Sequence, residues 1–464
     1  MATTPVEVVR DRRRRLSQAL QDRGADFPVA LWSGRAPSKN FPANRHYFRA
    51  NSHFLYFAGL GVENAVIVLD RIGDRDHLSL FWNEPGPGSA LWHGPEPSRD
   101  QIAAAMGADA AYELSELFHA LDEAATVYLP DPAMRSAQES ALGRSLFPSP
   151  APASIGRTLM EAIASVRLCH DDFAIAQIRD AIKVSIEAHK TGIKATKTSQ
   201  WESEVRAAME SIIYGHQCRP AYNSIVSIAG EVLHNNHYHH PLNDGDLLLA
   251  DVGAETPLGW ASDITRTWPV SGTFSPTQKA VYDVVLEAHD RAIAAVNPGA
   301  DYQAIHLLSA QVLAEGFVDL GILRGNPEDL VETDAHALFF PHGLGHLLGL
   351  DVHDMEDLGD ISGYGPGRVR SDRFGLGFLR LSRILEASML VTIEPGFYQV
   401  PAILNDSERR DRYGDRVNWD RLAEFSDVRG IRIEDDVLVT ETGHEILTRD
   451  LPVSTEAIEE LMAA

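Results

Sequence analysis

Five residues of the types that bind metal ions lie in apolar, strand-like sequence in the second half of the chain: Asp251, Asp263, His346, Glu394 and Glu434. Buried ionised carboxylates are costly unless they are paired, hydrogen-bonded or bound to metal. Four carboxylates that converge on one site would repel each other, and two divalent cations remove that repulsion. The set is therefore interpreted as a dinuclear metal centre. Mostly oxygen ligands with one nitrogen favour Mn²⁺, with Zn²⁺ and Co²⁺ as alternatives.

The spacing of these residues predicts how strands present them. Asp251 and Asp263 lie on consecutive strands joined by a tight connection, and their even separation places both on one face of a hairpin if no bulge intervenes. Neighbouring strands are about 5 Å apart, which suits two carboxylates that share metals. Arg432 lies two positions before Glu434 on the same strand face, so it is expected to orient Asp251 and the Tyr398 hydroxyl.

The segments around the five residues, in order LLLADVGAE, ASDITRTW, FPHGLGHLLGLDVHD, TIEPGFY and RGIRIEDDV, resemble the pita-bread metallopeptidases that cleave bonds before proline. These are aminopeptidase P and prolidase. The resemblance runs from about residue 165 to the end, with a weaker match in FRANSHFLYFAGL and LWHG. It implies an α/β N-terminal domain over 1–165 and an α+β pita-bread catalytic domain over 166–464. Two ααβ halves related by a pseudo-twofold axis are expected in the second domain.

The resemblance also implies roles for individual residues. Asp251 would bind one metal and His346 the other, while Asp263 and Glu434 would bridge both. Glu394 would bind metal, act as general base towards the attacking water and return the proton to the leaving nitrogen. The residues expected to contact substrate, or to support those that do, are His234, His353, Arg432, Tyr222, Trp92, Arg380, His342 and Tyr398.

Arg380 bears on the subclass. In prolidase an arginine at the corresponding place grips the C-terminal carboxylate of a dipeptide, and Arg–carboxylate pairing is strong and bidentate. This favours an Xaa-Pro dipeptidase slightly, with an Xaa-Pro aminopeptidase acting on longer peptides as the alternative. Arg380 as a plain surface cation and Trp92 as a simple core residue stay open, as do core or surface roles for the histidines.

Two further classes of protein share the fold that the resemblance implies. A non-catalytic pita-bread binding protein would typically have lost metal ligands, and an enzyme of other chemistry on this fold, such as creatine hydrolysis, lacks the metal set. The intact five residues argue against both. Hydrolysis of organophosphorus esters stays open as a side activity.

The composition of the chain restricts the classes of molecule that it is expected to bind. The net charge of −25 and a pI near 5.1 argue against nucleic acid and anionic membranes. Two cysteines suit a reducing compartment, and neither a spanning apolar run nor a signal peptide is visible, so a cytoplasmic location is expected. The expected partner is a proline-containing di- or oligopeptide, and the resemblance implies a homodimer or homotetramer.

Alternation of apolar runs predicts the main elements. In the first domain, strands are expected at 28–33, 64–70, 76–82 and 126–130, with helices at 99–106 and 112–122. The basic cluster from Arg12 to Arg15 is interpreted as the solvated face of a first helix rather than a nucleic-acid patch. Residues 149–154 are expected to be a linker. In the second domain, helices are expected at 171–194, 201–216, 276–296 and 302–319, with strands at 222–229, 246–254, 260–269, 388–399 and 429–440.

Three further segments are polar. Inserts at 355–380 and 400–428 are expected to be surface loops. The tract HNNHYHH (234–240) could bind metal, but only His234 is assigned to the site. His237, His239 and His240 are expected at the rim.

Overall fold

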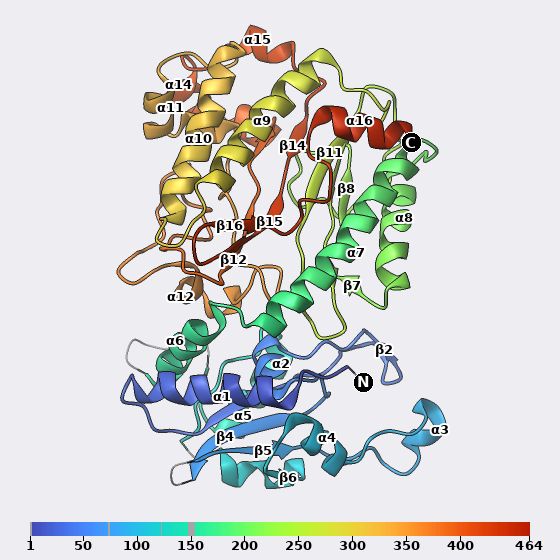
Figure 1. Cartoon of the computed structure of the whole chain (residues 1–464), viewed down its shortest axis with the longest axis vertical. Helices are drawn as coiled ribbons and strands as arrows, with labels where there is room; N and C mark the ends of the chain where they lie inside the picture. Colours follow the sequence, from blue (N-terminus) through green and yellow to red (C-terminus); the bar gives the residue numbers. More distant parts are fainter. Residues whose placement is uncertain (1, 73–74, 122, 147–153) are drawn as a thin grey trace. The chain divides into compact units, whose positions relative to one another are not determined.

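The computed structural model describes residues 2–72, 75–121, 123–146 and 154–464 (Figure 1). It divides into two compact units, Met1–Leu168 and Cys169–Ala464. The expected linker lies outside the described residues except for Ser154, which caps helix α6 (Ile155–Arg167) by accepting from the backbone N–H of Arg157. Residue 165 lies in the last turn of this helix, so the division follows the helix end. Among the described residues, no helix combines the length and apolar character needed to span a bilayer.

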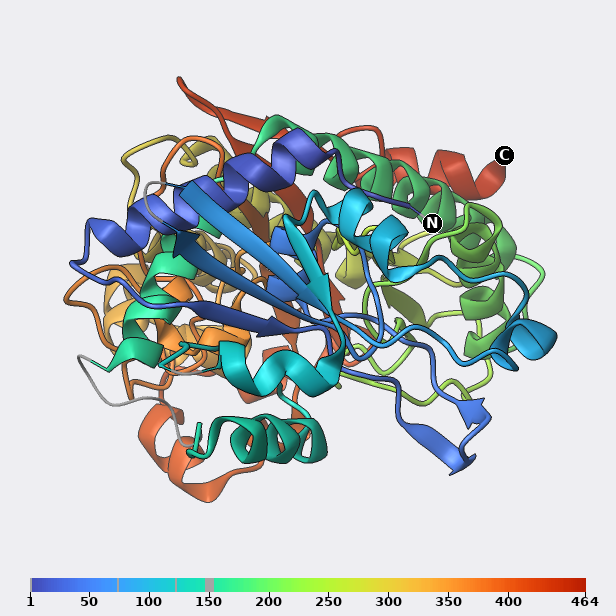
Figure 2. The ribbon, with the colours of Figure 1, turned by 90° about the horizontal axis from the view of Figure 1, so that it is seen from below.

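A mixed four-stranded sheet forms the core of the first unit. Its order is β1 (Val29–Trp32), β4 (Val66–Ile72), β5 (Arg75–Phe81), β6 (Ala110–Tyr112), and only the β5–β6 pair is parallel. Figure 2 shows this sheet with α1 (Val6–Gln21) on one side and the 3₁₀ helix η1 (Leu114–Ala120) on the other. Leu117 of η1 packs against Ala30, Val66 and Phe81. The helix expected at 112–122 is thus a shorter 3₁₀ helix.

The strand expected at 126–130 is wrong. Ala125 makes an isolated parallel bridge with Val29, but residues 126–130 form no strand. Thr126 and Val127 are nevertheless buried. An apolar run indicates that a segment is buried, but a strand also needs a neighbouring strand with which its backbone can pair.

The prediction of a solvated basic face on the first helix is also wrong at two positions. Arg12 and Arg13 are buried. Their guanidinium groups donate to the carbonyls of Tyr56 and Phe57, at the end of helix α2 (Ser52–Ala58), and Arg13 donates also to the carbonyl of Met106. Carbonyls in the last turn of a helix lack partners within it. These arginines therefore cap neighbouring helices instead of facing water.

Two helix pairs flank the strands of the second unit (Figure 1). One pair is α7 (Asp172–Thr196) with α8 (Glu202–Gly215), and the other is α9 (Pro276–Ala294) with α10 (Tyr302–Asp319). Side chains of Asp171, Ser275 and Asp301 cap the N-termini of α7, α9 and α10. The four helices expected from the sequence are all present.

Each helix pair belongs with an antiparallel three-stranded sheet. The first sheet has the order β11 (Thr265–Pro269), β9 (Leu247–Asp251), β8 (Ile225–Ser227), and the second has β12 (Leu390–Ile393), β15 (Asp435–Val439), β16 (His444–Ile446). A bridge between Thr265 and Glu434 joins the two halves. The expected long strands over 388–399 and 429–440 are each broken, and their other parts, β13 (Gly396–Tyr398) and β14 (Gly430–Arg432), pair with each other.

The two inserts are not plain surface loops. Residues 355–380 include η3 (Glu356–Leu358) and α12 (Asp360–Gly363), and residues 400–428 include α13 (Pro401–Leu404), α14 (Ser407–Tyr413) and α15 (Trp419–Ala423). Leu358, Leu376, Tyr413 and Leu422 from these segments are buried. Each insert therefore contributes to the core of the second unit.

Candidate metal centre and peptide-binding cavity

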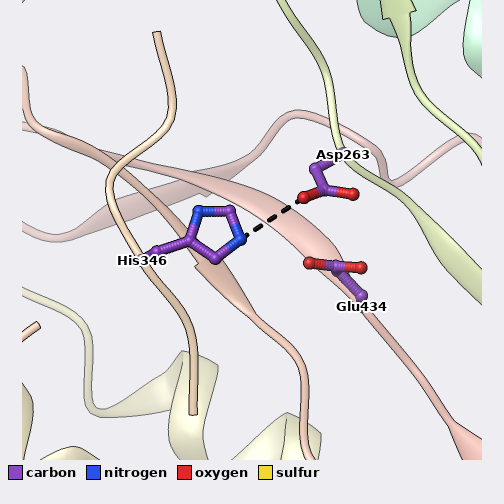
Figure 3. Close-up of side chains that lie close together, drawn as sticks. All are labelled: Asp263, His346 and Glu434. Carbon is purple, nitrogen blue, oxygen red and sulfur yellow. Dashed lines mark ion pairs between the residues drawn. The ribbon is translucent and has the colours of Figure 1, made fainter. Parts of the chain in front are cut away.

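The predicted metal-binding residues meet in one cavity of about 610 Å³ in the second unit. Asp263, His346 and Glu434 each present a ligand atom, and these atoms lie within 4.8 Å of one another. Figure 3 shows the three side chains pointing toward one another from separate segments, with the imidazole Nε2 3.3 Å from Asp263 Oδ2. The carboxylates of Asp251 and Glu394 line the same cavity.

The β9–β11 hairpin places the two aspartates on one face. Asp251 pairs with Thr265 across the hairpin, and Asp263 lies two residues before Thr265. Both aspartate side chains therefore lie on the same face, at diagonal positions. Tyr222 lies close to both carboxylates, with its hydroxyl 2.5 Å from Asp251 Oδ1 and from Asp263 Oδ1. Gly253 allows the hairpin to close, since a Cβ there would lie 1.9 Å from the carbonyl oxygen of Ser262.

His346 is held in the tautomer that a metal ligand needs. Its Nδ1–H donates to the carbonyl of Leu347 at 3.1 Å, which leaves Nε2 unprotonated toward the carboxylates. Its backbone is tied to the neighbouring strand, because Thr392 N donates to His346 O and His346 N donates to Thr392 Oγ1. Glu394 follows that strand, and its Oε1 is 3.6 Å from His346 Nε2.

Arg432 is the last residue of β14, and Glu434 lies two residues beyond it. Thr265 Oγ1 donates to Glu434 Oε2 at 2.7 Å, so the two halves are joined by side chains as well as by the backbone bridge. The buried Arg432 guanidinium donates to Asp251 Oδ2, to Thr265 Oγ1 at 3.0 Å and to the Tyr398 hydroxyl at 3.2 Å. Arg432 therefore contacts both Asp251 and Tyr398, as its position two residues before Glu434 predicts.

The electrostatics of the cluster match a cation site. Burial, with the charges of neighbouring carboxylates, raises the pKa of Asp263 to about 8 and that of Glu434 well above its ordinary value. Burial likewise raises the pKa of Glu394 to about 7, with His346 and Arg432 acting in the opposite direction. The donor set of carboxylate oxygens and one imidazole nitrogen suits hard or borderline divalent cations. The residues present therefore fit such ions.

A second hydrogen-bonded chain borders the cluster. His342 Nδ1–H donates to the carbonyl of Gly343 at 2.8 Å, so its Nε2 accepts from the Tyr398 hydroxyl at 2.9 Å. Burial and the nearby Arg432 charge lower the pKa of His342 to about 3, which keeps the ring neutral. The order from Arg432 through Tyr398 to His342 gives each polar group a defined donor or acceptor role.

The expected substrate residues are distributed unevenly. His234, His353 and Arg380 line the cavity, and the ring of His353 lies 4.0 Å from that of His346 between centroids. The Tyr222 hydroxyl contacts the two aspartates, and the residue is not part of the cavity lining, so its contact with substrate stays a prediction. Trp92 lies on α3 (Ser89–His93) in the first unit, where its side chain is 80% exposed, so simple core packing is wrong.

The remaining histidines of the polar tract lie outside the cavity lining. His240 Nδ1 contacts the buried carboxylate of Glu202, while the rings of His237 and His239 contact each other. Glu202 also accepts from Ser227 Oγ and from the backbone N–H of Ile228. This carboxylate therefore fixes the loop on which His234 lies.

Sequence reasoning missed several cavity residues. Glu231, Arg370 and Phe378 line the cavity, and Glu356, from a smaller neighbouring pocket, contacts the cavity residues His353 and Arg380. Glu356 follows His353 by three residues, a spacing that could have indicated the contact. For Glu231, Arg370 and Phe378, nothing in the local sequence indicates the cavity.

Comparison with known proteins agrees with this geometry. Residues 176–441 match the model of metallopeptidase family M24, and residues 9–128 match the model of the aminopeptidase P N-terminal domain. The chain belongs to metallopeptidase family M24. The expected fold, an N-terminal domain of the aminopeptidase P type followed by a pita-bread catalytic domain, is confirmed, and the chain is a metal-dependent peptidase.

Individual relatives cover nearly the whole chain. The Xaa-Pro aminopeptidase of Escherichia coli is 32% identical over 474 aligned positions, covering 99% of each chain. Human Xaa-Pro dipeptidase is 30% identical and covers 94% of this chain and 88% of its own. Among solved structures, aminopeptidase P from E. coli in a low-pH form aligns with a TM-score of 0.81 at 29% identity, covering 99% of this chain and 98% of that one. An aminopeptidase structure from Pseudomonas aeruginosa has a TM-score of 0.79 at 29% identity, covering 100% and 99%.

Proposed function

We propose that the protein is an Xaa-Pro aminopeptidase that removes the N-terminal residue of peptides with proline in second place. The observation that carries this proposal is the single cavity lined by Asp251, Asp263, His346, Glu394 and Glu434. The full-length relatives named Xaa-Pro aminopeptidase add support. They favour the alternative from the sequence over its slight preference for a dipeptidase.

These five side chains would hold two divalent cations, with Mn²⁺ as the proposed ions and Zn²⁺ or Co²⁺ as alternatives. When bound, such ions polarise the scissile carbonyl and lower the pKa of the attacking water. Proline nitrogen belongs to a tertiary amide and carries no N–H. A site that acts on the carbonyl side does not need that N–H, which is consistent with cleavage before proline.

The protein's own residues would carry the proton transfers. Glu394 borders the cavity, and a pKa of about 7 suits a carboxylate that must both accept and release a proton near neutral pH. It would take a proton from water and deliver it to the leaving proline nitrogen. Burial lowers the pKa of His353, so its ring is neutral and can bond to the peptide without adding charge.

The other groups would orient the reacting ones. Arg432 donates one hydrogen bond to Asp251 and another to the Tyr398 hydroxyl. His342 accepts from the same tyrosine hydroxyl. We propose that this chain fixes the carboxylate and the hydroxyl in the positions that the reaction needs, while His234 contacts substrate at the exposed rim.

An Xaa-Pro dipeptidase is the second candidate. Arg380 lines the cavity and could grip the carboxylate of a dipeptide, and human Xaa-Pro dipeptidase is among the relatives.

Trp92, exposed on the first unit, is proposed as an aromatic contact for the proline ring. A homodimer or homotetramer and a cytoplasmic location are proposals that rest on the resemblance and on the composition. Light scattering after gel filtration tests the assembly.

The experiment is a set of initial rates with Mn²⁺, Zn²⁺ or Co²⁺ on Ala-Pro-Ala, Ala-Pro and Ala-Ala-Ala. The proposal expects release of alanine from Ala-Pro-Ala, a much slower reaction with Ala-Pro and none with Ala-Ala-Ala. Cleavage of Ala-Pro alone, lost in Arg380→Ala, would establish the dipeptidase instead. Cleavage of Ala-Ala-Ala at a similar rate would refute proline specificity.

A further inference from the structure

An ion pair borders the cavity: Arg380 lines it, and Glu356 lines a smaller neighbouring pocket to which Arg380 and the metal-binding residue His346 also contribute. Arg380 Nη1 donates to Glu356 Oε2 at 2.6 Å, and His353 Nδ1 lies 3.2 Å from the same oxygen. Both Arg380 and His353 line the cavity, and the His353 ring lies 4.0 Å from that of His346 between centroids. A carboxylate is therefore present beside the guanidinium that a dipeptide's own carboxylate would seek.

The two segments that carry the pair are fixed to one another. Ser382 N donates to the carbonyl of Gly363 at 2.9 Å, and Gly365 N donates to the carbonyl of Ser382 at 2.9 Å. A Cβ on Gly363 would lie 2.2 Å from the carbonyl oxygen of Arg380, so the two chains approach as closely as backbone allows. The fold therefore fixes the backbone around Arg380, and the side chains of the pair, each 38% exposed, are within reach of a bound peptide.

The arginines of the cavity lining are each paired with a carboxylate. Besides the pair of Arg380 with Glu356, Arg370 donates to Asp360 and Arg432 donates to Asp251. Although burial acts to raise it, contacts with His353 and Arg380 hold the pKa of Glu356 at about 2. Glu356 is thus ionised at neutral pH and cancels the positive charge of Arg380.

We propose that Glu356 is a specificity residue that selects peptides continuing beyond proline and rejects dipeptides. The inference rests on the proposed aminopeptidase activity, with the carboxyl end of the peptide lying toward Arg380. In a longer peptide, the carbonyl of proline accepts from the guanidinium, and the next amide N–H donates to Glu356. A dipeptide ends in a carboxylate at that place, has no N–H to donate and is repelled by Glu356.

The test is the ratio of kcat/KM for Ala-Pro-Ala to kcat/KM for Ala-Pro, measured in wild type and in Glu356→Gln. Glutamine keeps an acceptor for His353 but removes the charge. The ratio is expected to fall roughly ten- to a hundredfold, the range for a hydrogen bond to a charged group. Because both substrates are measured on one preparation, partial misfolding or metal loss cancels in the ratio.

Two further variants identify the cause of a change. Asp372→Asn removes a negative charge from an exposed position of the same insert, outside the cavity lining, and should leave the ratio unchanged. In Glu356→Gln combined with Arg380→Ala, the gain on Ala-Pro should disappear, because that gain needs the released guanidinium.

The outcomes separate the inference from the proposed function. Wild type that cleaves Ala-Pro-Ala, with a ratio unchanged in Glu356→Gln, overturns the role of Glu356 and leaves the aminopeptidase proposal standing. An equal loss on both substrates also overturns it, since Glu356 would then serve only to orient His353 and Arg380. Wild type that cleaves only Ala-Pro overturns the aminopeptidase proposal itself.

Discussion

Arg432 donates a hydrogen bond to the carboxylate of Asp251, although the two residues lie 181 positions apart in the chain. The contact joins the β9–β11 hairpin of one half to the β14 segment of the other. Arg432 is also within reach of Tyr398 and Thr265. One buried guanidinium thus aligns groups from both halves at the metal-binding cluster.

Replacement of Arg432 tests this alignment. Arg432→Lys keeps a positive charge but loses the planar fork that reaches three acceptors. We expect metal affinity or kcat to fall about 10- to 100-fold, the usual effect of losing a partner of a metal ligand. Metal titration by calorimetry and steady-state rates measure it. Arg179→Lys, at an exposed pair with Glu445, is the matched control and should change neither quantity; an equal effect there would contradict the prediction.

Glu394→Gln tests the proton-transfer role. The amide keeps the size of the side chain but cannot act as a base, so kcat should fall at least about a hundredfold. Circular dichroism should show an unchanged fold. A variant that retains more than a tenth of wild-type kcat with full metal occupancy would show that another group transfers the proton.

The raised pKa values predict how metal-free protein responds to pH. Asp263 and Glu394 have pKa values of about 8 and about 7 in the fold, above the ordinary carboxyl values they take when unfolded. The folded state therefore binds more protons, and its stability falls as pH rises from about 5 to about 8. Added Mn²⁺ should stabilise the protein more at about pH 8 than at about pH 5, because bound ligands must be deprotonated. Thermal melts with chelator and with Mn²⁺ check both trends, and a metal-free melting temperature that rises across this window would contradict them.

Gly253 should be intolerant of any side chain. In Gly253→Ala the new methyl would meet the Ser262 carbonyl, so the hairpin that carries both aspartates must shift. We expect a loss of about 1–3 kcal/mol in the free energy of unfolding, together with weaker metal binding. Gly215→Ala is the control, because no atom lies within 4 Å of a Cβ at this helix end. Urea unfolding compares the two, and equal stability would show that the hairpin adapts freely.

Much of the catalytic unit could be predicted from local sequence. Three of the four long helices begin at a side chain that caps them, and all four were expected from the sequence close to their observed bounds. The five metal-binding residues stand out because ionised groups within apolar strands need a compensating partner. Broken strands were harder to predict, since the apolar runs over 388–399 and 429–440 continue through the points where pairing changes.

By itself, the sequence determined which residues can do the chemistry and in what order the chain presents them. Only the tertiary structure decided which polar groups meet. Tyr222 contacts the two aspartates, and Glu356 contacts Arg380. Arg13, which the local pattern assigned to solvent, caps the end of a neighbouring helix. The physical reason is that propensity and periodicity act over a few residues. Hydrogen bonds and charges depend instead on distances between segments that folding alone brings together.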